Sequence, residues 1–220
     1  MWINDKSLCE YGGFLTTGYK VSGCELDVTV LQGRNRTSLG LLHASPGLKK
    51  LTVPIVFRGR SSEDVSCKKS MFEQLIFGKN ELIMEDGLLY TAVLSSIGNA
   101  EFIGTKAIKT EYVFTAVRHG NYVKKNGNTV YCDSTLPYTD CILTVTVSKD
   151  STNYKVGSVI FENVAAGEIL TVDGINGRIL VNGTPAAERA DWIEFPKLVP
   201  GENTIQCDDE LTVEFYPAYF

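Results

Sequence analysis

Alternating apolar and polar positions indicate short β-strands along the first part of the chain. Within Cys24–Leu31, the apolar Leu26, Val28 and Val30 fall on one side and polar residues fall on the other. A strand with this pattern presents one apolar face, which must be covered by something else. The same kind of pattern predicts further strands at Met1–Asn4, Gly18–Val21, Leu51–Arg58, Glu81–Met84, Leu88–Leu94 and Ile108–Val117.

One segment, residues 61–77, has the periodicity of an amphipathic helix. Ser61 can cap its N-terminus, Asp64 can complete a capping box, and Gly78 can end the helix. We expect the helix to pack on a sheet rather than on a membrane or a partner helix. Its predicted apolar stripe consists of Val65, Met71, Phe72, Leu75 and Ile76.

A β-hairpin is predicted around Glu85-Asp86-Gly87, between the apolar runs Glu81–Met84 and Leu88–Leu94. Glycine tolerates the positive φ that a tight turn needs, so an Asp-Gly pair between apolar runs is a strong hairpin signal.

The pattern changes after a polar stretch at Arg118–Asp140, which contains Asn126-Gly127 and Pro137. We interpret this stretch as the connection between two domains, residues 1–130 and 131–220, with a hairpin around Asn-Gly as a further possibility. Short strands at regular intervals predict a β-sandwich in the second domain. These strands are Cys141–Ser148, Ser158–Asn163, Glu168–Asp173, Arg178–Val181, Asp191–Phe195, Asn203–Cys207 and Leu211–Tyr216.

The composition is that of an ordinary globular protein. The chain has 220 residues, of which 44% are apolar and 21% charged. Its apolar runs are only a few residues long, so no membrane span is expected. The start, MWINDKSLCEYGG, lacks a basic region followed by an apolar core, so we expect no secretory signal and synthesis in a cytoplasm.

The net charge of −5 is unevenly spread. Residues 1–117 carry 13 Lys and Arg against 12 Asp and Glu, residues 118–140 carry 3 against 2, and residues 141–220 carry 5 against 12. The acidity therefore lies in the last part, where it repels phosphate backbones and argues against specific nucleic-acid binding. We interpret it as a solvated face that keeps an exposed domain soluble.

No motif of an enzyme or cofactor site is present. His43 and His119 have no second ligand at metal-binding spacing, and there is no nucleophile elbow, phosphate loop or dinucleotide glycine pattern. The six cysteines form no C-x-x-C pair and are expected to be free thiols, although Cys132 and Cys141 could face each other across a loop. We therefore expect no catalysis, no metal and no cofactor.

Trp192 is a candidate for sugar binding. A tryptophan on a sandwich strand can stack on the face of a sugar, but it can equally fill the core or an interface. No cluster of Arg, Asn and His accompanies it, so core packing is the favoured interpretation.

The last third of the chain resembles the C-terminal part of phage distal tail proteins, the siphophage tail-component family. The resemblance is carried by a hairpin with Asn182-Gly183 at its tip, the acidic-aromatic strand Asp191–Phe195, the turn segment Leu198–Ile205 with its P-G-x-N sequence, and the aromatic ending Tyr216–Tyr219. Asn4-Asp5-Lys6, Gly33–Asn35 and Leu88–Leu94 agree more loosely with the opening strand, a G-R-N loop and a Tyr-x-Ala strand of that family.

The resemblance implies a mainly β protein: an N-terminal β-sandwich with one α-helix and a β-hairpin, followed by a C-terminal galectin-like β-sandwich. It implies a virion structural protein of the tail tip or baseplate, assembled in the bacterial host cytoplasm. It also implies a homo-hexameric ring that contacts the tail-tube protein and the tail-associated hub or lysin protein, with receptor-binding proteins as further partners, and no cofactor.

For ring closure we expect three surfaces in the N-terminal part: the strand Cys24–Leu31, the loop Gly33–Ser38 and the hairpin Glu81–Leu94. The candidate interface residues are Arg34, Asn35 and Arg36 in the loop and Asp86, Gly87 and Leu88 at the hairpin tip. Two other functions stay open, a carbohydrate-binding module that uses Trp192 and a tail-tube protein that stacks into long tubes.

Overall fold

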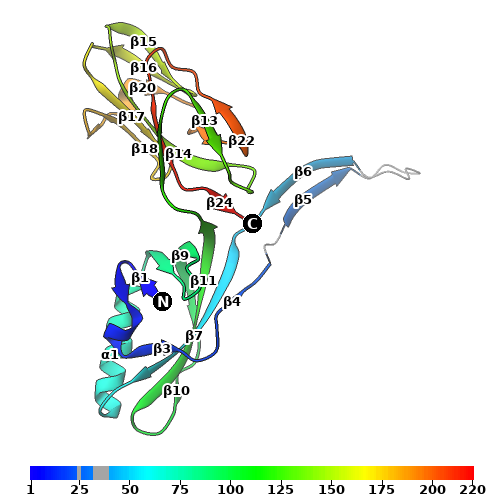
Figure 1. Ribbon diagram of the computed structural model, residues 1–220, viewed down its shortest axis with the longest axis vertical. Helices are drawn as coiled ribbons and strands as arrows, with labels where there is room; N and C mark the ends of the chain where they lie inside the picture. Colours follow the sequence, from blue (N-terminus) through cyan, green and yellow to red (C-terminus); the bar gives the residue numbers. More distant parts are fainter. Residues whose placement is uncertain (24–25, 32–39) are drawn as a thin grey trace. The chain divides into compact units, whose positions relative to one another are not determined.

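The computed structural model describes residues 1–23, 26–31 and 40–220, and it divides into two compact units (Figure 1). The first comprises Met1–His119 with Phe220, and the second comprises Gly120–Tyr219. Both are built mainly of β-strands, and the described residues contain one α-helix. The predicted fold class is confirmed.

The first unit contains a large antiparallel sheet with the strand order β2-β1-β8-β9-β11-β7-β3, in which β10 pairs with β11 and β4 with β7. A separate two-stranded ribbon is formed by β5 and β6. The elements of the unit are β1 Trp2–Ile3, β2 Lys6–Ser7, η1 Leu8–Tyr11, β3 Gly13–Leu15, β4 Lys20–Val21, β5 Leu26–Leu31, β6 Gly40–Pro46, β7 Lys49–Arg58, α1 Ser62–Leu75, β8 Lys79–Ile83, β9 Leu89–Ile97, β10 Glu101–Phe102 and β11 Ala107–His119.

The helix α1 packs on one face of this sheet, against β7 and β11. Ser61 caps it as predicted, since its hydroxyl accepts from the Asp64 amide at 3.2 Å. Phe72 of the helix lies edge-on to Tyr112 of β11, with ring centroids 5.3 Å apart. The inward-facing apolar side chains of β7 and β11 thus pack against the apolar side chains of α1, and together they form the core of the first unit.

Met71 was predicted in the apolar stripe of the helix and is instead 54% exposed. Val65, Phe72 and Ile76 are fully buried, so the prediction is confirmed for these three positions of the stripe. Successive helical residues are rotated by about 100°, so Met71 lies well away from the line through the other three side chains.

The second unit carries a larger sheet with the order β12-β23-β14-β17-β18-β19, the pair β13-β22 and the three-stranded sheet β15-β16-β20, while β21 pairs with β14. Its core is independent of the first and includes Leu143, Phe161, Leu170 and Phe215. The elements are β12 Val123–Asn126, β13 Thr129–Cys132, β14 Thr139–Thr146, β15 Ser151–Val156, β16 Val159–Val164, β17 Ile169–Asp173, β18 Arg178–Val181, β19 Thr184–Pro185, η2 Ala187–Arg189, β20 Ala190–Asp191, β21 Lys197–Leu198, β22 Gly201–Thr204, β23 Thr212–Phe215 and β24 Ala218–Tyr219.

The polar stretch 118–140 contributes strands to the second unit. β12 pairs with β23 and β13 pairs with β22, so Asn126 and Gly127 join strands of different sheets instead of turning a hairpin. Gly127 has φ +117° and its amide donates to the Leu211 carbonyl at 2.8 Å. The expected boundary between residues 130 and 131 therefore falls inside β13, whereas the compact units divide after His119.

Candidate functional site

The ribbon β5–β6 exposes an apolar face. Leu26, Val28 and Val30 lie on one side of β5, opposite Pro46, Ala44 and Leu41 of β6. Between the pairs Thr29–His43 and Val30–Leu41, β6 has one extra residue, Leu42, in a β-bulge. Because of this bulge, Leu41 lies opposite Val30 and the apolar face continues to the end of the ribbon. The large apolar side chains of the ribbon are 45–65% exposed: Leu26, Val28, Val30, Leu31, Leu41 and Leu42.

The opposite face of the ribbon is more polar, with Asp27, Thr29 and His43, and it also carries Leu31 at the end of β5. The ribbon pairs with no other strand among the described residues. A two-stranded hairpin alone is marginally stable in water, and an exposed apolar stripe on it is typical of a surface that another chain covers. Its chemistry is that of a protein-protein contact.

The residues Arg34, Asn35 and Arg36, predicted at the ring interface, lie outside the described residues. They fall in the segment between the end of β5 and the start of β6.

The predicted hairpin tip is present between β8 and β9. Gly87 has φ +81°, and its amide donates to the Met84 carbonyl at 3.0 Å. The Asp86 carboxylate accepts from the Tyr19 hydroxyl at 2.5 Å and from the Leu88 amide at 3.1 Å. The Tyr19 hydroxyl bond holds the pKa of Asp86 below its usual value, so the carboxylate stays charged.

Of this triplet, Asp86 and Gly87 are exposed, and Leu88 is half-buried against the core of the first unit. The tip thus offers a small polar surface that the chain itself fixes in place. Its role in ring formation stays a prediction.

Trp192 is half-buried and packs against the core of the second unit. Its ring centroid lies 6.2 Å from that of Phe195, with the planes inclined by 51°. The neighbouring Ile193 is completely exposed. Sugar stacking on Trp192 therefore stays a prediction that rests on the exposed part of its ring.

A cleft of about 560 Å³ lies beside this segment, entirely within the second unit. Four parts of the chain form it: Tyr138 just before β14, the β15–β16 turn, the segment 194–199, and residues 204–206 at the end of β22 and just after it. The sequence did not reveal this cleft, because its walls come from distant parts of the chain. The lining residues are Tyr138, Gly157, Ser158, Glu194, Phe195, Pro196, Lys197, Val199, Thr204, Ile205 and Gln206.

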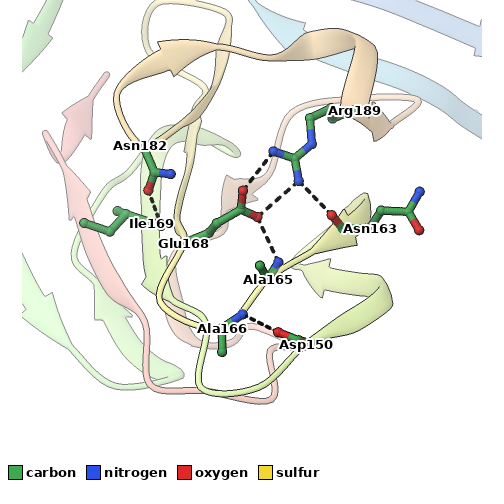
Figure 2. A network of polar contacts seen from close by, with 8 residues as sticks. All are labelled: Asp150, Asn163, Ala165, Ala166, Glu168, Ile169, Asn182 and Arg189. Carbon is green, nitrogen blue, oxygen red and sulfur yellow. Dashed lines mark hydrogen bonds and ion pairs between the residues drawn. The ribbon is translucent and has the colours of Figure 1, made fainter.

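A network of polar contacts fixes the loop between β16 and β17 (Figure 2). The Arg189 guanidinium, from η2, binds both carboxylate oxygens of Glu168 at 3.0 and 3.1 Å and donates to the Asn163 carbonyl at 2.8 Å. The second oxygen of Glu168 also accepts from the Ala165 amide at 3.0 Å. Arg189 is the main reason that the pKa of Glu168 is lowered. Glu168 and Arg189 pair their charges, and the Asp150 carboxylate accepts from the Ala166 amide at 2.7 Å, so the network holds the loop in place.

Other observations bear on chemistry and location. Cys132 and Cys141 are buried free thiols, and burial raises the pKa of Cys141 to about 12. Across residues 1–23, 26–31 and 40–220, no three His, Cys, Asp or Glu side chains are grouped so that they could hold a metal ion. That same part of the chain has no helix with the length and apolar character needed to cross a membrane.

Comparison with known proteins identifies the second unit. Residues 134–219 match the model of the family described as the siphovirus-type tail component, C-terminal domain. This match confirms the resemblance seen in the last third of the sequence. No curated protein matches the chain.

Two solved structures show the same fold. The Dit protein (gp 19.1) of phage SPP1, described as a paradigm of the hub adsorption apparatus in phages that infect Gram-positive bacteria, matches with a TM-score of 0.69 and 13% identity, over 99% of this chain and 98% of its own. A chain of the phage P2 baseplate, in its activated conformation with Ca, matches with a TM-score of 0.53 and 10% identity, over 91% of this chain and 89% of its own.

Proposed function

We propose that this protein is a structural hub at the distal end of a siphovirus tail, where six copies form a ring. The proposal starts from two similarities: the second unit to the C-terminal domain of siphovirus tail components, and the whole fold to the Dit protein of a phage hub adsorption apparatus. The protein would act in the virion, after assembly in the cytoplasm of the bacterial host, and would need neither catalysis nor a cofactor.

The single observation that carries the ring is the apolar face of β5–β6. In a closed ring each copy presents one surface to a different surface on the next copy. A ribbon with one apolar and one more polar face suits such a contact, because only one of its sides needs to be covered. The ribbon includes most of the strand that the sequence marked for subunit joining.

The second unit supports a role as docking platform. Residues 120–219 carry 7 Lys and Arg against 14 Asp and Glu, a net charge of −7, while residues 1–119 carry 14 against 12, a net charge of +2. An acidic domain remains soluble when exposed and favours partners with basic surfaces. We propose receptor-binding proteins as its partners, and the tail-tube protein and the hub or lysin protein as the partners of the ring.

Native mass spectrometry and negative-stain microscopy of the purified protein test the ring. The proposal expects a six-copy mass and a closed ring with six-fold symmetry. Long stacked tubes would favour the tail-tube alternative instead. A monomer that persists even with the tail partners present would contradict both.

The hairpin tip has its own test in the same assay. Replacing Glu85-Asp86-Gly87 by a two-residue Asn-Gly turn shortens the tip, keeps Leu88 against the core and leaves Ile83 opposite Leu89. If the shortened protein still forms the ring, the tip is not part of the interface and the ribbon remains as the joining surface.

A further inference from the structure

We propose that the cleft of the second unit binds a neutral saccharide. The inference goes beyond the ring and does not depend on it. The volume of about 560 Å³ falls within the roughly 300–1,000 Å³ typical of small-ligand sites. It differs from the Trp192 hypothesis, because Trp192 packs against the core and does not line the cleft.

The cleft has an aromatic ring that is free to stack. Tyr138 is 63% exposed, and the Lys197 ammonium lies 5.7 Å from its ring centroid. That cation–π contact favours this position of the ring and leaves most of the side chain exposed. The electron-rich face of an aromatic ring attracts groups with partial positive charge, such as the C–H groups on the flat side of a sugar. Phe195 adds a second ring to the lining.

Polar groups surround this ring at positions suited to hydroxyls. Lys155 donates to Gln206 at 2.6 Å, and because an ammonium can only donate, the accepting atom is Oε1 and the Nε2 hydrogens are left to donate. The Glu194 side chain is 70% exposed and can accept. A sugar hydroxyl both donates and accepts, so it can use both kinds of group.

The balance of charge favours a neutral ligand. Glu194 and Lys197 are the charged side chains among the lining residues, and they form an ion pair at 3.6 Å. An anionic or cationic ligand would find no excess of opposite charge there. The polar side chains that interrupt the apolar lining also disfavour a lipid tail, which leaves a ligand with apolar faces and polar edges.

The walls of the cleft are fixed before any ligand binds. The Ser158 hydroxyl donates to the Glu194 carbonyl at 3.0 Å, and the Gly157 amide donates to the Gln206 carbonyl at 2.9 Å. These two bonds tie the β15–β16 turn to the segment 194–199 and to residues 204–206, and Tyr138 contacts Lys197 of the same segment. Binding therefore orders little of the protein, which lowers the entropic cost.

The test uses the purified full-length protein on an array of hexose- and N-acetylhexosamine-containing oligosaccharides, followed by titration of the strongest binder by NMR. We expect saturable binding that falls at least about tenfold in Tyr138→Ala, since truncating an aromatic anchor removes the main contact. Tyr138→Phe should keep most of the affinity because the ring remains. Glu194→Gln should weaken binding several-fold through loss of the charged acceptor.

Tyr131→Ala is the matched control. Tyr131 is a 72% exposed tyrosine in the same unit and does not line the cleft, so its removal should leave binding unchanged. The proposal is overturned if no saccharide on the array binds, if Tyr131→Ala and Tyr138→Ala weaken binding equally, or if Trp192→Phe abolishes binding while Tyr138→Ala does not. The mass of the ring, measured in the same samples, reports on the proposed function separately.

Discussion

At the scale of single residues, the network around Glu168 shows how the second unit holds the short loop between β16 and β17 in one conformation. Asn163, near the end of β16, has φ +51°, a left-handed conformation that asparagine tolerates better than most residues. Its carbonyl is held by Arg189, and the Glu168 carboxylate closes the other end of the loop through the Ala165 amide. One ion pair therefore fixes both ends of the loop.

Glu168→Gln is expected to lower the free energy of unfolding at pH 7 by about 1–2 kcal/mol, because a charge-assisted, bidentate pair becomes a neutral contact. The pKa of Glu168 in the folded protein lies below its usual value of 4.5. Its contribution is therefore fully present above about pH 4.5 and is lost as the pH falls through the folded-state pKa. The difference between variant and parent should shrink in urea unfolding curves recorded at decreasing pH.

Glu162→Gln is the control for this prediction. Glu162 is an exposed carboxylate of the neighbouring strand β16, outside the Glu168–Arg189 network. It should change stability much less at pH 7. A loss that stays constant from pH 7 down to pH 3 would show that the charge of Glu168 is not its source.

At the scale of elements, the ribbon β5–β6 carries the sharpest expectation about assembly. Val28 lies at the centre of the apolar face, and Thr29 is its direct neighbour on the other face. Both positions are exposed in the single chain. A charge at either position should therefore leave the fold of the subunit intact.

Val28→Glu should abolish or strongly weaken the ring, since burying an unpaired carboxylate in an apolar interface costs several kcal/mol. Thr29→Glu carries the same charge on the opposite face and should retain the ring. Native mass spectrometry of the two variants provides the measurement. Equal loss in both would mean that both faces are covered, and equal retention would remove the ribbon from the interface.

The strands that sequence could predict are those whose alternation is strong. The stretches Arg178–Val181 and Glu168–Asp173 agree with β18 and β17 to within a residue. The strand β15, Ser151–Val156, was missed because its exposed positions are Ser, Thr, Asn and Lys, and only Tyr154 and Val156 face the core. Conversely, Asp191–Phe195 was predicted as a strand, but pairing stops at Asp191. Its aromatic residues lie in and beside a bend of the chain and still pack inward. The spacing of apolar residues alone cannot distinguish such a bend from a short strand.

At the scale of the whole molecule, the chain consists of two units with separate cores. Composition and charge indicated two domains, but the division after His119 was not visible, because the short strands β12 and β13 lie within the polar stretch 118–140. The cleft could not be predicted from the sequence either. Tyr138, Gly157 and Gln206 are far apart in sequence, and only the folded sheets bring them together.

A fragment of residues 120–220 should fold without the rest of the chain, because it retains its complete core. We expect a single cooperative transition in thermal circular dichroism and a monomeric mass, since the ribbon is missing from it. A gradual transition would show that the second core depends on the first unit. A six-copy mass would place the joining surface in the second unit instead of the ribbon.

The ribbon also affects how the free subunit behaves before assembly. Within the described residues, β5 and β6 pair only with each other, so each offers an open row of backbone donors and acceptors on its outer side. Open strand edges next to exposed leucine and valine side chains can pair with strands of other molecules, which leads to aggregation. The net charge of −7 on residues 120–219 opposes such encounters by mutual repulsion, and salt weakens that repulsion. The purified subunit should therefore be most soluble at low ionic strength, and its turbidity should rise as salt is added.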